Sequence, residues 1–365
     1  MGIQCGIVGL PNVGKSTLFN ALTKTAAAQA ENYPFCTIEP NVGDVAMPDA
    51  RLDQLAKIAG SQELIPSRIQ FVDIAGLVEG ASKGEGLGNK FLATIREVDA
   101  VVYVLRCFED DDITHVNNKI DPMADFEIVE TELMLADLES LEKRLPAMKK
   151  KLAQKDKEAV AQLPLIEAAL AVLQEGKPAR LVEVAADQKK TWKGLQLLTQ
   201  KPVLFVANVD EDAAATGNEF SKMVDQRATQ EGAAAIIISA KIESELAQLD
   251  DDEQAEYLAE LDLEEPGLNR LIRTSYGLLN LQTYFTCGPK EARAWTVKIG
   301  ATAPQAAGVI HTDFEKGFIR AETISFDDYV TLNGEAGAKE AGKMRLEGKE
   351  YIVKDGDVMH FRFNN

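Results

Sequence analysis

Several residue types and patterns are scarce in this 365-residue chain. It has no run of about 18 apolar residues, so we expect no membrane span. Its four cysteines are scattered and form no CxxC pair, so their spacing argues against a zinc site. The start, Met-Gly-Ile-Gln-Cys, lacks a basic region followed by a long apolar core, so we expect no secretory signal. Together these absences predict a reducing, cytoplasmic location with buried free thiols.

Positive charge is also scarce. Lys and Arg number 39 against 58 Asp and Glu, which gives a net charge of −19. A chain-wide cationic surface for nucleic acid is therefore excluded, and any RNA contact needs a local basic patch. Acidic residues cluster at 109–112 and between 250 and 265, where we expect solvated loop or helix faces. The length and the hydrophobic fraction of 45% are typical of a globular protein with about two or three domains.

Short β-rich runs alternate with helical stretches through much of the chain. The runs with strand character are 3–10, 41–47, 69–76, 100–108, 202–210 and 233–241. Continuous apolar strands separated by helices predict an α/β fold with a mostly parallel sheet covered on both faces. A helix is expected at 15–24, directly after the first strand.

The strand pattern stops between about 128 and 200. Leu138, Leu141, Leu145, Met148 and Leu152 recur at alternating spacings of three and four, which is a heptad seam. Pro164 is expected to begin or kink a returning helix that carries Ile166, Leu170 and Leu173. This pattern predicts an antiparallel helical arm, partly coiled coil, which serves as a lever or docking arm.

The arm divides the expected domains. We predict a nucleotide-binding domain from 1–127 and 201–280, the arm at 128–200, and a small α+β domain at 281–365. The last of these is indicated by short strands in AWTVKIG, GFIRAETI and EYIVKDGDVMHFRF.

A phosphate-binding loop is the strongest motif. Residues 9–17, GLPNVGKST, match G-x-x-x-x-G-K-[ST] and lie between an expected strand and an expected helix, the context that supports the motif. Gly9 and Gly14 let the backbone approach phosphate closely, and Lys15 is predicted to reach the β- and γ-phosphates. The Ser16 hydroxyl is predicted to ligate Mg²⁺. Asn12, Val13 and Thr17 complete the predicted nucleotide-binding loop.

A second motif, Asp73-x-x-Gly76, ends the strand at 69–76. We expect Asp73 to hold Mg²⁺ through water and the Gly76 N–H to sense the γ-phosphate. Thr37 is the natural first switch residue, binding Mg²⁺ when the γ-phosphate is present; the alternative is a surface turn residue. A loop ordered by the γ-phosphate and released on hydrolysis is the expected switch.

The position that often carries a water-orienting Gln, directly after this motif, is Leu77. Hydrolysis is therefore expected to be slow or to need another group. His115, after the strand at 100–108, is a candidate catalytic residue, and an exposed loop histidine is the alternative. Asn12 is a candidate for holding K⁺ beside the phosphates, and local capping of the loop is the alternative.

These motifs together resemble the YchF subfamily of Obg-related P-loop NTPases. The matching parts are Gly9–Ser16, residues 32–43 (NYPFCTIEPNVG), Asp73–Leu77, the inserted arm and Asn208–Glu211. The resemblance covers essentially the whole chain, and its C-terminal part is similar to a TGS domain, a ubiquitin-like β-grasp module. It implies a P-loop ATPase, unusual among its GTPase relatives, that associates with ribosomes.

The residues at the end of the strand at 202–210 are expected to contact the base of the nucleotide. Guanine readers end this strand in Asn-Lys-x-Asp, whereas this chain has Asn208, Val209 and, in place of the final Asp, Glu211. Glu211 is one methylene longer, so its carboxylate is displaced from the geometry that accepts from guanine. Asn208 can still pair with the adenine edge, and Val209 can meet the base through its backbone. Ser239 and Ala240, in SAK, are expected to bring N–H groups near the base.

ATP is therefore the favoured substrate, with GTP weaker. The alternatives are a GTP-binding translation factor and a nucleotide-regulated RNA or ribosome adaptor with incidental hydrolysis. A monomer is expected. Basic side chains on the arm and the tail offer an RNA cleft, and an ordinary charged surface is the alternative; they are Lys143, Arg144, Lys149, Lys150, Lys151, Lys155, Lys157, Lys339, Lys343, Arg345, Lys349, Lys354 and Arg362.

Overall fold

The computed structural model of the chain describes residues 3–32, 41–74, 87–110 and 120–364. At its centre lies a six-stranded sheet in the order β2-β4-β1-β5-β6-β7. Its strands are β1 (Gln4–Val8), β2 (Val42–Ala46), β4 (Arg68–Asp73), β5 (Ala100–Arg106), β6 (Val203–Asn208) and β7 (Ala234–Ile238). Neighbouring strands run parallel except β2 and β4. Each expected run overlaps one of these strands, which confirms the mostly parallel sheet.

Strands β5 and β6 are neighbours although the whole arm separates them in the sequence. They pair in parallel from Val101 with Val203 to Arg106 with Asn208. Every residue of both strands is buried, as their unbroken apolar sequences require in a sheet covered on both faces. The arm is therefore an insertion between two central strands.

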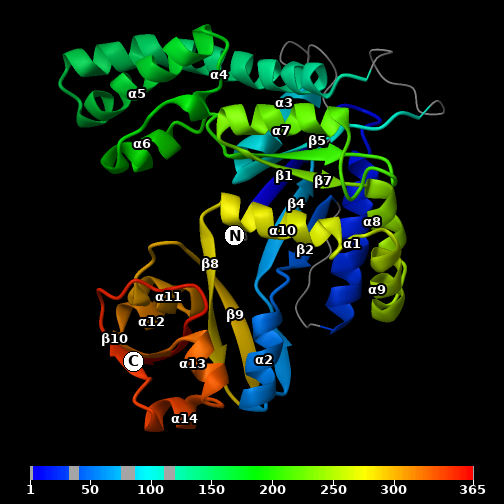
Figure 1. The fold of residues 1–365 in the computed structure, drawn as a ribbon. Coiled ribbons are helices and arrows are strands. Elements are labelled where there is room, and N and C mark those ends of the chain that lie inside the picture. The colour runs from blue at the N-terminus through cyan, green and yellow to red at the C-terminus, as the bar shows by residue number, and fades with distance from the viewer. Residues whose placement is uncertain (1–2, 33–40, 75–86, 111–119, 365) are drawn as a thin grey trace.

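Helices cover both faces of this sheet. α7 lies above it and α10 below it in Figure 1, and the carboxyl ends of the parallel strands point toward α1 and α8. The helices around the sheet are α1 (Lys15–Asn32), α3 (Leu87–Glu97), α7 (Glu219–Glu231), α8 (Ala240–Leu246), α9 (Asp251–Glu260) and α10 (Gly267–Leu278). α1 follows β1 and α8 follows β7, so both helices begin at the same edge of the sheet.

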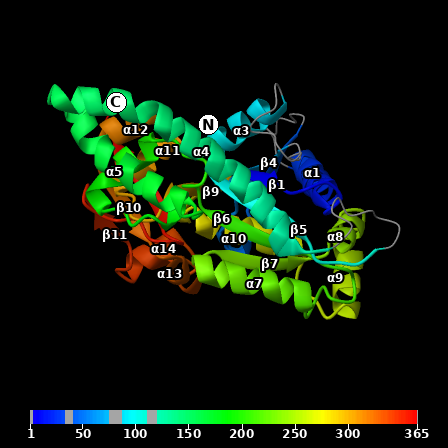
Figure 2. The same ribbon diagram turned by 90° about the horizontal axis from the view of Figure 1, so that it is seen from above.

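The arm consists of the second half of α4 (Pro122–Ala153), α5 (Lys157–Gln174), η1 (Ala179–Leu181), η2 (Ala186–Gln188) and α6 (Lys189–Gly194). Figure 2 shows α4 crossing the sheet and extending past it beside α5. The arm has its own core, in which Leu141 and Met148 of α4 meet Ile166, Leu170 and Leu173 of α5.

The structure differs in part from the expected heptad seam of the arm and from the expected start of its returning helix. Leu138 and Leu145 pack at the edge of the arm core, whereas Leu152 is 38% exposed. Pro164 does not begin the returning helix: α5 begins at Lys157, after Asp156 accepts a hydrogen bond from the Ala159 N–H. The short side chain of Asp156 caps the helix about two turns earlier than a start at Pro164 would.

The first half of α4 does not belong to the arm. Phe126, Val129, Leu133 and Ala136 are buried in the core of the central sheet. The long helix therefore begins on the sheet and becomes the arm only after about four turns, which fixes the direction of the arm relative to the sheet.

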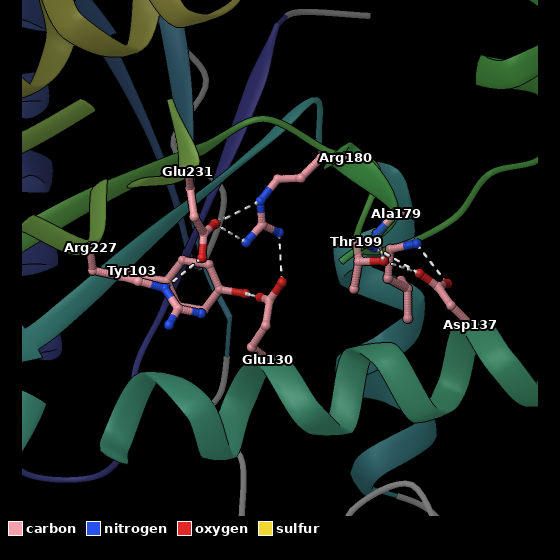
Figure 3. Close-up of polar contacts among 9 residues, drawn as sticks. Tyr103, Glu130, Asp137, Ala179, Arg180, Thr199, Arg227 and Glu231 are labelled. Atoms are coloured by element: carbon pink, nitrogen blue, oxygen red, sulfur yellow. Dashed lines mark hydrogen bonds and ion pairs between the residues drawn. The ribbon is translucent and has the colours of Figure 1, made fainter. Parts of the chain in front are cut away.

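Buried polar contacts fix the base of the arm, as Figure 3 shows. Arg180 donates to Glu130 at 2.6 Å and to Glu231 at 2.5 Å, and the Tyr103 hydroxyl on β5 donates to Glu130 at 2.5 Å. The side chains of Glu130, Glu231 and Arg180 are only 3, 6 and 10% exposed. Burial, followed by the charge of Glu130, raises the pKa of Tyr103 well above its usual value.

Asp137 lies about two turns after Glu130 on α4. Its carboxylate accepts hydrogen bonds from the backbone N–H groups of Leu198 and Thr199, both at 2.8 Å. The Thr199 hydroxyl donates to the same carboxylate at 2.7 Å. Asp137 thereby holds the returning chain just before it enters β6. With the cluster around Arg180, it ties the arm to the sheet by buried side chains whose polar groups are satisfied.

The C-terminal part is built on a second six-stranded sheet in the order β11-β10-β12-β8-β9-β3. Its elements after residue 280 are β8 (Leu281–Cys287), β9 (Glu291–Lys298), α11 (Ala303–Ile310), α12 (Thr312–Lys316), β10 (Phe318–Ile324), α13 (Phe326–Thr331), α14 (Glu335–Glu340), β11 (Arg345–Glu347) and β12 (Val358–Phe363). The mixed sheet with helices is the α+β arrangement expected from the sequence.

A segment from the N-terminal half completes this second sheet. β3 (Glu63–Ile65) pairs in parallel with β9. α2 (Ala50–Ala59) places Leu52 and Leu55 in the core that holds Phe285 of β8. The sequence places these residues within 1–127, the expected nucleotide-binding part, but their apolar faces are buried against the C-terminal strands. The two parts are thus joined by a shared sheet and a shared core.

Among the described residues, no helix is long and apolar enough to cross a membrane. Cys5 and Cys107 are buried free thiols and Cys287 is a half-buried one. Burial raises the pKa of each of these thiols to about 12. Cys36 lies outside the described residues.

Candidate nucleotide-binding site

The loop between β1 and α1 is shaped by close approaches of its backbone. A Cβ at Gly9 would lie 2.7 Å from the carbonyl oxygen of Val104. At Gly14, φ is +87° and a Cβ would lie 2.1 Å from Nδ2 of Asn208. Glycine is therefore required at both positions. Because α1 begins directly at Lys15, the N–H groups of its first turn have no acceptor within the helix and face an incoming anion.

Lys15 and Asp73 form an ion pair between the ammonium Nζ and the carboxylate Oδ1. Their side chains are 11% and 20% exposed. The two groups that the sequence assigns to phosphate and to Mg²⁺ are thus adjacent.

The residues present fit a Mg²⁺ ion. The Ser16 hydroxyl is exposed at the start of α1, and Asp73 supplies a carboxylate. Within the described residues, no three or more His, Cys, Asp or Glu side chains are grouped as a metal site. Mg²⁺ is usually held by one or two protein oxygens together with substrate phosphates and waters. Ser16 and Asp73 match that pattern, with the nucleotide as the remaining ligand.

A cavity of about 880 Å³ opens at this edge of the sheet, and its size is in the range of small-molecule sites. It is lined by Leu10, Pro11, Asn12, Gly14, Lys15, Ser16, Thr17, Phe108, Glu109, Asp110, Asn208, Val209, Asp210, Glu211, Ser239, Ala240, Lys241, Ser244 and Glu245. The predicted phosphate residues and the predicted base residues therefore lie in one cavity. Of the predicted loop residues, Gly9 and Val13 do not line the cavity, and Val13 is buried behind it.

Asn208 connects the two ends of the cavity. Its Nδ2 donates to the carbonyl of Val13 at 2.8 Å, and its Oδ1 accepts from the N–H of Ala240 at 2.9 Å. An amide has two donor hydrogens and two acceptor lone pairs, so one of each remains for a base. The Ala240 N–H, which we expected near the base, is used in this contact.

Glu211 is paired with a residue that the sequence did not single out. Its Oε1 lies 2.5 Å from Nζ of Lys241, and the two side chains are 39% and 65% exposed. The hydrogen bond that Lys241 donates to Glu211, followed by the charges of Glu211, Glu245 and Asp110, raises the pKa of Lys241. Val209 is buried, with its N–H donating to the carbonyl of Ile238 at 2.9 Å.

Phe108 and Asp110 also line the cavity. Phe108 ends the run that we expected to be a strand, and Asp110 lies in the acidic stretch that we expected to be solvated. Arg106, at the end of β5, organises this loop. Its guanidinium lies 4.7 Å from the centre of the Phe108 ring and donates to the carbonyls of Phe108 and Asp110 at 3.2 Å. The available sequence signal was position: residues directly after a central parallel strand lie at the ligand-binding edge.

Three predicted residues lie outside the described residues: Thr37, Gly76 and His115. Their predicted roles in sensing the γ-phosphate, binding Mg²⁺ and hydrolysis therefore stay predictions.

Known proteins match the chain along its whole length. A family model described as a 50S ribosome-binding GTPase matches residues 4–137. A YchF GTPase C-terminal model, described as a protein of unknown function (DUF933), matches residues 281–364. A relative from Haemophilus ducreyi named ribosome-binding ATPase YchF is 60% identical over 364 residues, which cover 100% of both chains.

The chain belongs to the YchF family. A Bacillus subtilis member, also named ribosome-binding ATPase YchF, is 54% identical over 366 residues and 100% of both chains. The solved structure of the Schizosaccharomyces pombe YchF GTPase has a TM-score of 0.88 and 37% identity, and the match covers 99% of this chain and 98% of that one. The P-loop fold class and the family resemblance are thereby confirmed.

Proposed function

We propose that the chain is a P-loop ATPase that hydrolyses ATP to ADP and phosphate, binds ATP more tightly than GTP, and associates with the ribosome. The observation that carries the base preference is the pairing of Glu211 with Lys241, beside a phosphate loop with its expected geometry. A guanine reader presents a free carboxylate to the N1–H and the exocyclic amine. The bacterial relatives' names, ribosome-binding ATPase, support the same activity.

At the phosphate end, the N–H groups at the start of α1 and the Lys15 ammonium bind the β- and γ-phosphates. Ser16 and Asp73 would hold Mg²⁺, which supplies positive charge against the charge that builds on the phosphate oxygens. We propose that Thr37 and Gly76 complete the switch by contacting the Mg²⁺ site and the γ-phosphate.

Hydrolysis needs a positioned water, and Leu77 offers no hydrogen bond for it. We assign this role to His115. Asn12 lines the cavity and is proposed to help hold K⁺ beside the phosphates.

The arm is the proposed ribosome contact, together with the C-terminal part. Both extend to the same side of the central sheet in Figure 1. On the arm, Lys143 is paired with Glu139 at 2.5 Å, with the lysine side chain 73% exposed, while Lys150 and Lys151 are exposed in the last turn of α4. These side chains offer local positive charge to ribosomal RNA in spite of the net charge of −19. Such a protein is expected to act in the cytoplasm, as a monomer.

Steady-state turnover with Mg²⁺-ATP and Mg²⁺-GTP, with and without ribosomes, tests this function. We expect multiple turnovers of ATP at a higher kcat/KM than of GTP. Lys15→Ala should lose about a hundredfold or more, because the phosphates lose a charge-assisted contact. Lys57→Ala, an exposed lysine on α2, is the matched control and should keep the wild-type rate. His115→Ala should lower turnover and spare nucleotide affinity.

A second candidate, a GTP-binding translation factor, is favoured by the Schizosaccharomyces pombe relative, whose structure is named a GTPase. A higher kcat/KM for GTP would support it and contradict the ATPase. Absence of turnover with both nucleotides, with ribosome binding retained in Lys15→Ala, would instead identify an adaptor.

A further inference from the structure

Lys241 occupies a distinctive place in the cavity. Of the cavity-lining residues that the structure describes, Lys15 and Lys241 are the cations, and Lys15 belongs to the phosphate end. Lys241 lies in the first turn of α8, at the base end, within 2.5 Å of Glu211. Glu245 and Asp110 line the same cavity. Among the described lining residues, the one cation at the base end is therefore paired with the Glu211 carboxylate.

The buried hydroxyl next to it is unsatisfied. Ser239 is 3% exposed, lines the cavity, and its Oγ has no hydrogen-bond partner within the described residues. Buried polar groups seldom stay unpaired, so this hydroxyl is available to a base or to a carboxylate that moves into the cavity. Glu211, a carboxylate of the loop after β6 that lines the same cavity, is paired with Lys241.

We propose that Lys241 determines the base preference by holding Glu211 in the ion pair, away from the base. This inference rests on the proposed nucleotide site. A free carboxylate accepts hydrogen bonds from the N1–H and exocyclic amine of guanine, which stabilises GTP. Opposite adenine, the same carboxylate meets the N1 acceptor and repels it. Pairing with Lys241 removes the gain for guanine and the penalty for adenine together.

The test compares affinities for the non-hydrolysable analogues AMPPNP and GMPPNP with Mg²⁺, measured calorimetrically. Both analogues carry the same triphosphate, so the ratio of their affinities reports on the base alone. In Lys241→Ala, we expect the AMPPNP-to-GMPPNP affinity ratio to fall about tenfold, since Glu211 becomes free to accept from guanine. In Glu211→Gln, adding Lys241→Ala should change the ratio by less than about twofold.

Two further variants test whether the effect depends on a cation at position 241 or on the loss of any surface lysine. Lys222→Ala removes a lysine that pairs with Glu219 at 2.6 Å on the surface of α7, outside the cavity, and should leave the ratio unchanged. Lys241→Arg keeps a cation at the position and should retain most of the wild-type ratio. Because Lys241 is 65% exposed, its removal is not expected to unfold the protein.

The proposal is overturned if Lys241→Ala leaves the ratio within twofold of wild type, or shifts it equally in the Glu211→Gln background. The proposed ATP preference has a separate test in the wild-type ratio. A wild type that favours GMPPNP contradicts the ATP preference, whereas the change caused by Lys241→Ala tests the ion pair whichever base the wild type prefers.

Discussion

The phosphate end and the base end of the cavity are formed in different ways. At the phosphate end, we propose that backbone groups do most of the binding. A Cβ at Gly9 or Gly14 would collide with Val104 or Asn208. At the base end, side chains from separate segments set the geometry through pairings such as Glu211 with Lys241. Asn208 connects the two ends.

This difference explains why one end is recognisable from a motif and the other is not. Where the backbone itself must approach the phosphates closely, only glycine fits at the crowded positions. Such a site can therefore be recognised in the sequence as a motif. A side-chain site depends on which of several acids and cations pair in space. We propose that the side chains at the base end can pair in more than one way, and that the pairing decides which base binds more tightly.

The largest loss of stability is expected from a substitution at the base of the arm, away from both ends of the cavity. Such a variant separates an effect on stability from an effect on nucleotide binding. Arg180→Ala leaves Glu130 buried without its cation, whereas Glu231 keeps its pair with Arg227. Breaking a buried pair in this way costs about 3–5 kcal/mol. We expect a correspondingly lower free energy of unfolding in urea, with an unchanged ATP-to-GTP affinity ratio in the protein that remains folded.

Lys143→Ala is the control for this lesion, because its pair with Glu139 is exposed, with side chains 73% and 60% accessible. It should leave the unfolding free energy unchanged within error, as surface pairs usually do. Equal losses in the two variants would show that the buried network at the base of the arm has no special part in stability.

A smaller loss, confined to the cavity, is expected from Gly14→Ala. The added Cβ would meet the Asn208 amide, and the backbone at φ +87° disfavours a side chain. ATP and GTP affinities should both fall about a hundredfold, or about 2.7 kcal/mol, with their ratio preserved. Calorimetric titration with both nucleotides measures this.

Gly232→Ala provides the matched control. Its φ is +63° and a Cβ there would meet nothing within 4 Å, so it carries the backbone strain without the collision. Its nucleotide affinities should equal those of the wild type. A Gly14→Ala variant that changed the ATP-to-GTP ratio would break the separation of the two ends.

The fold was predictable where the pattern was local. The strands at 203–208 and 234–238 follow from unbroken apolar runs, and the phosphate loop follows from its glycines and its flanks. The insertion of the arm followed from the interruption of the strand pattern.

Long-range pairings were not predictable from one sequence. β3 is a three-residue strand whose partner, β9, lies far along the chain, and α2 shows an apolar face without indicating which core covers it. The Glu211 pairing with Lys241 is of the same kind, because it depends on how two loops meet at the sheet edge.

The central claim, that the base end favours adenine, is tested most directly by calorimetric titration of the wild-type protein with AMPPNP and GMPPNP in Mg²⁺. The double variant Val209→Lys with Glu211→Asp restores the guanine-reading side chains for comparison. We predict tighter binding of AMPPNP by the wild type and a shift toward GMPPNP in the double variant. Tighter binding of GMPPNP by the wild type would contradict the claim.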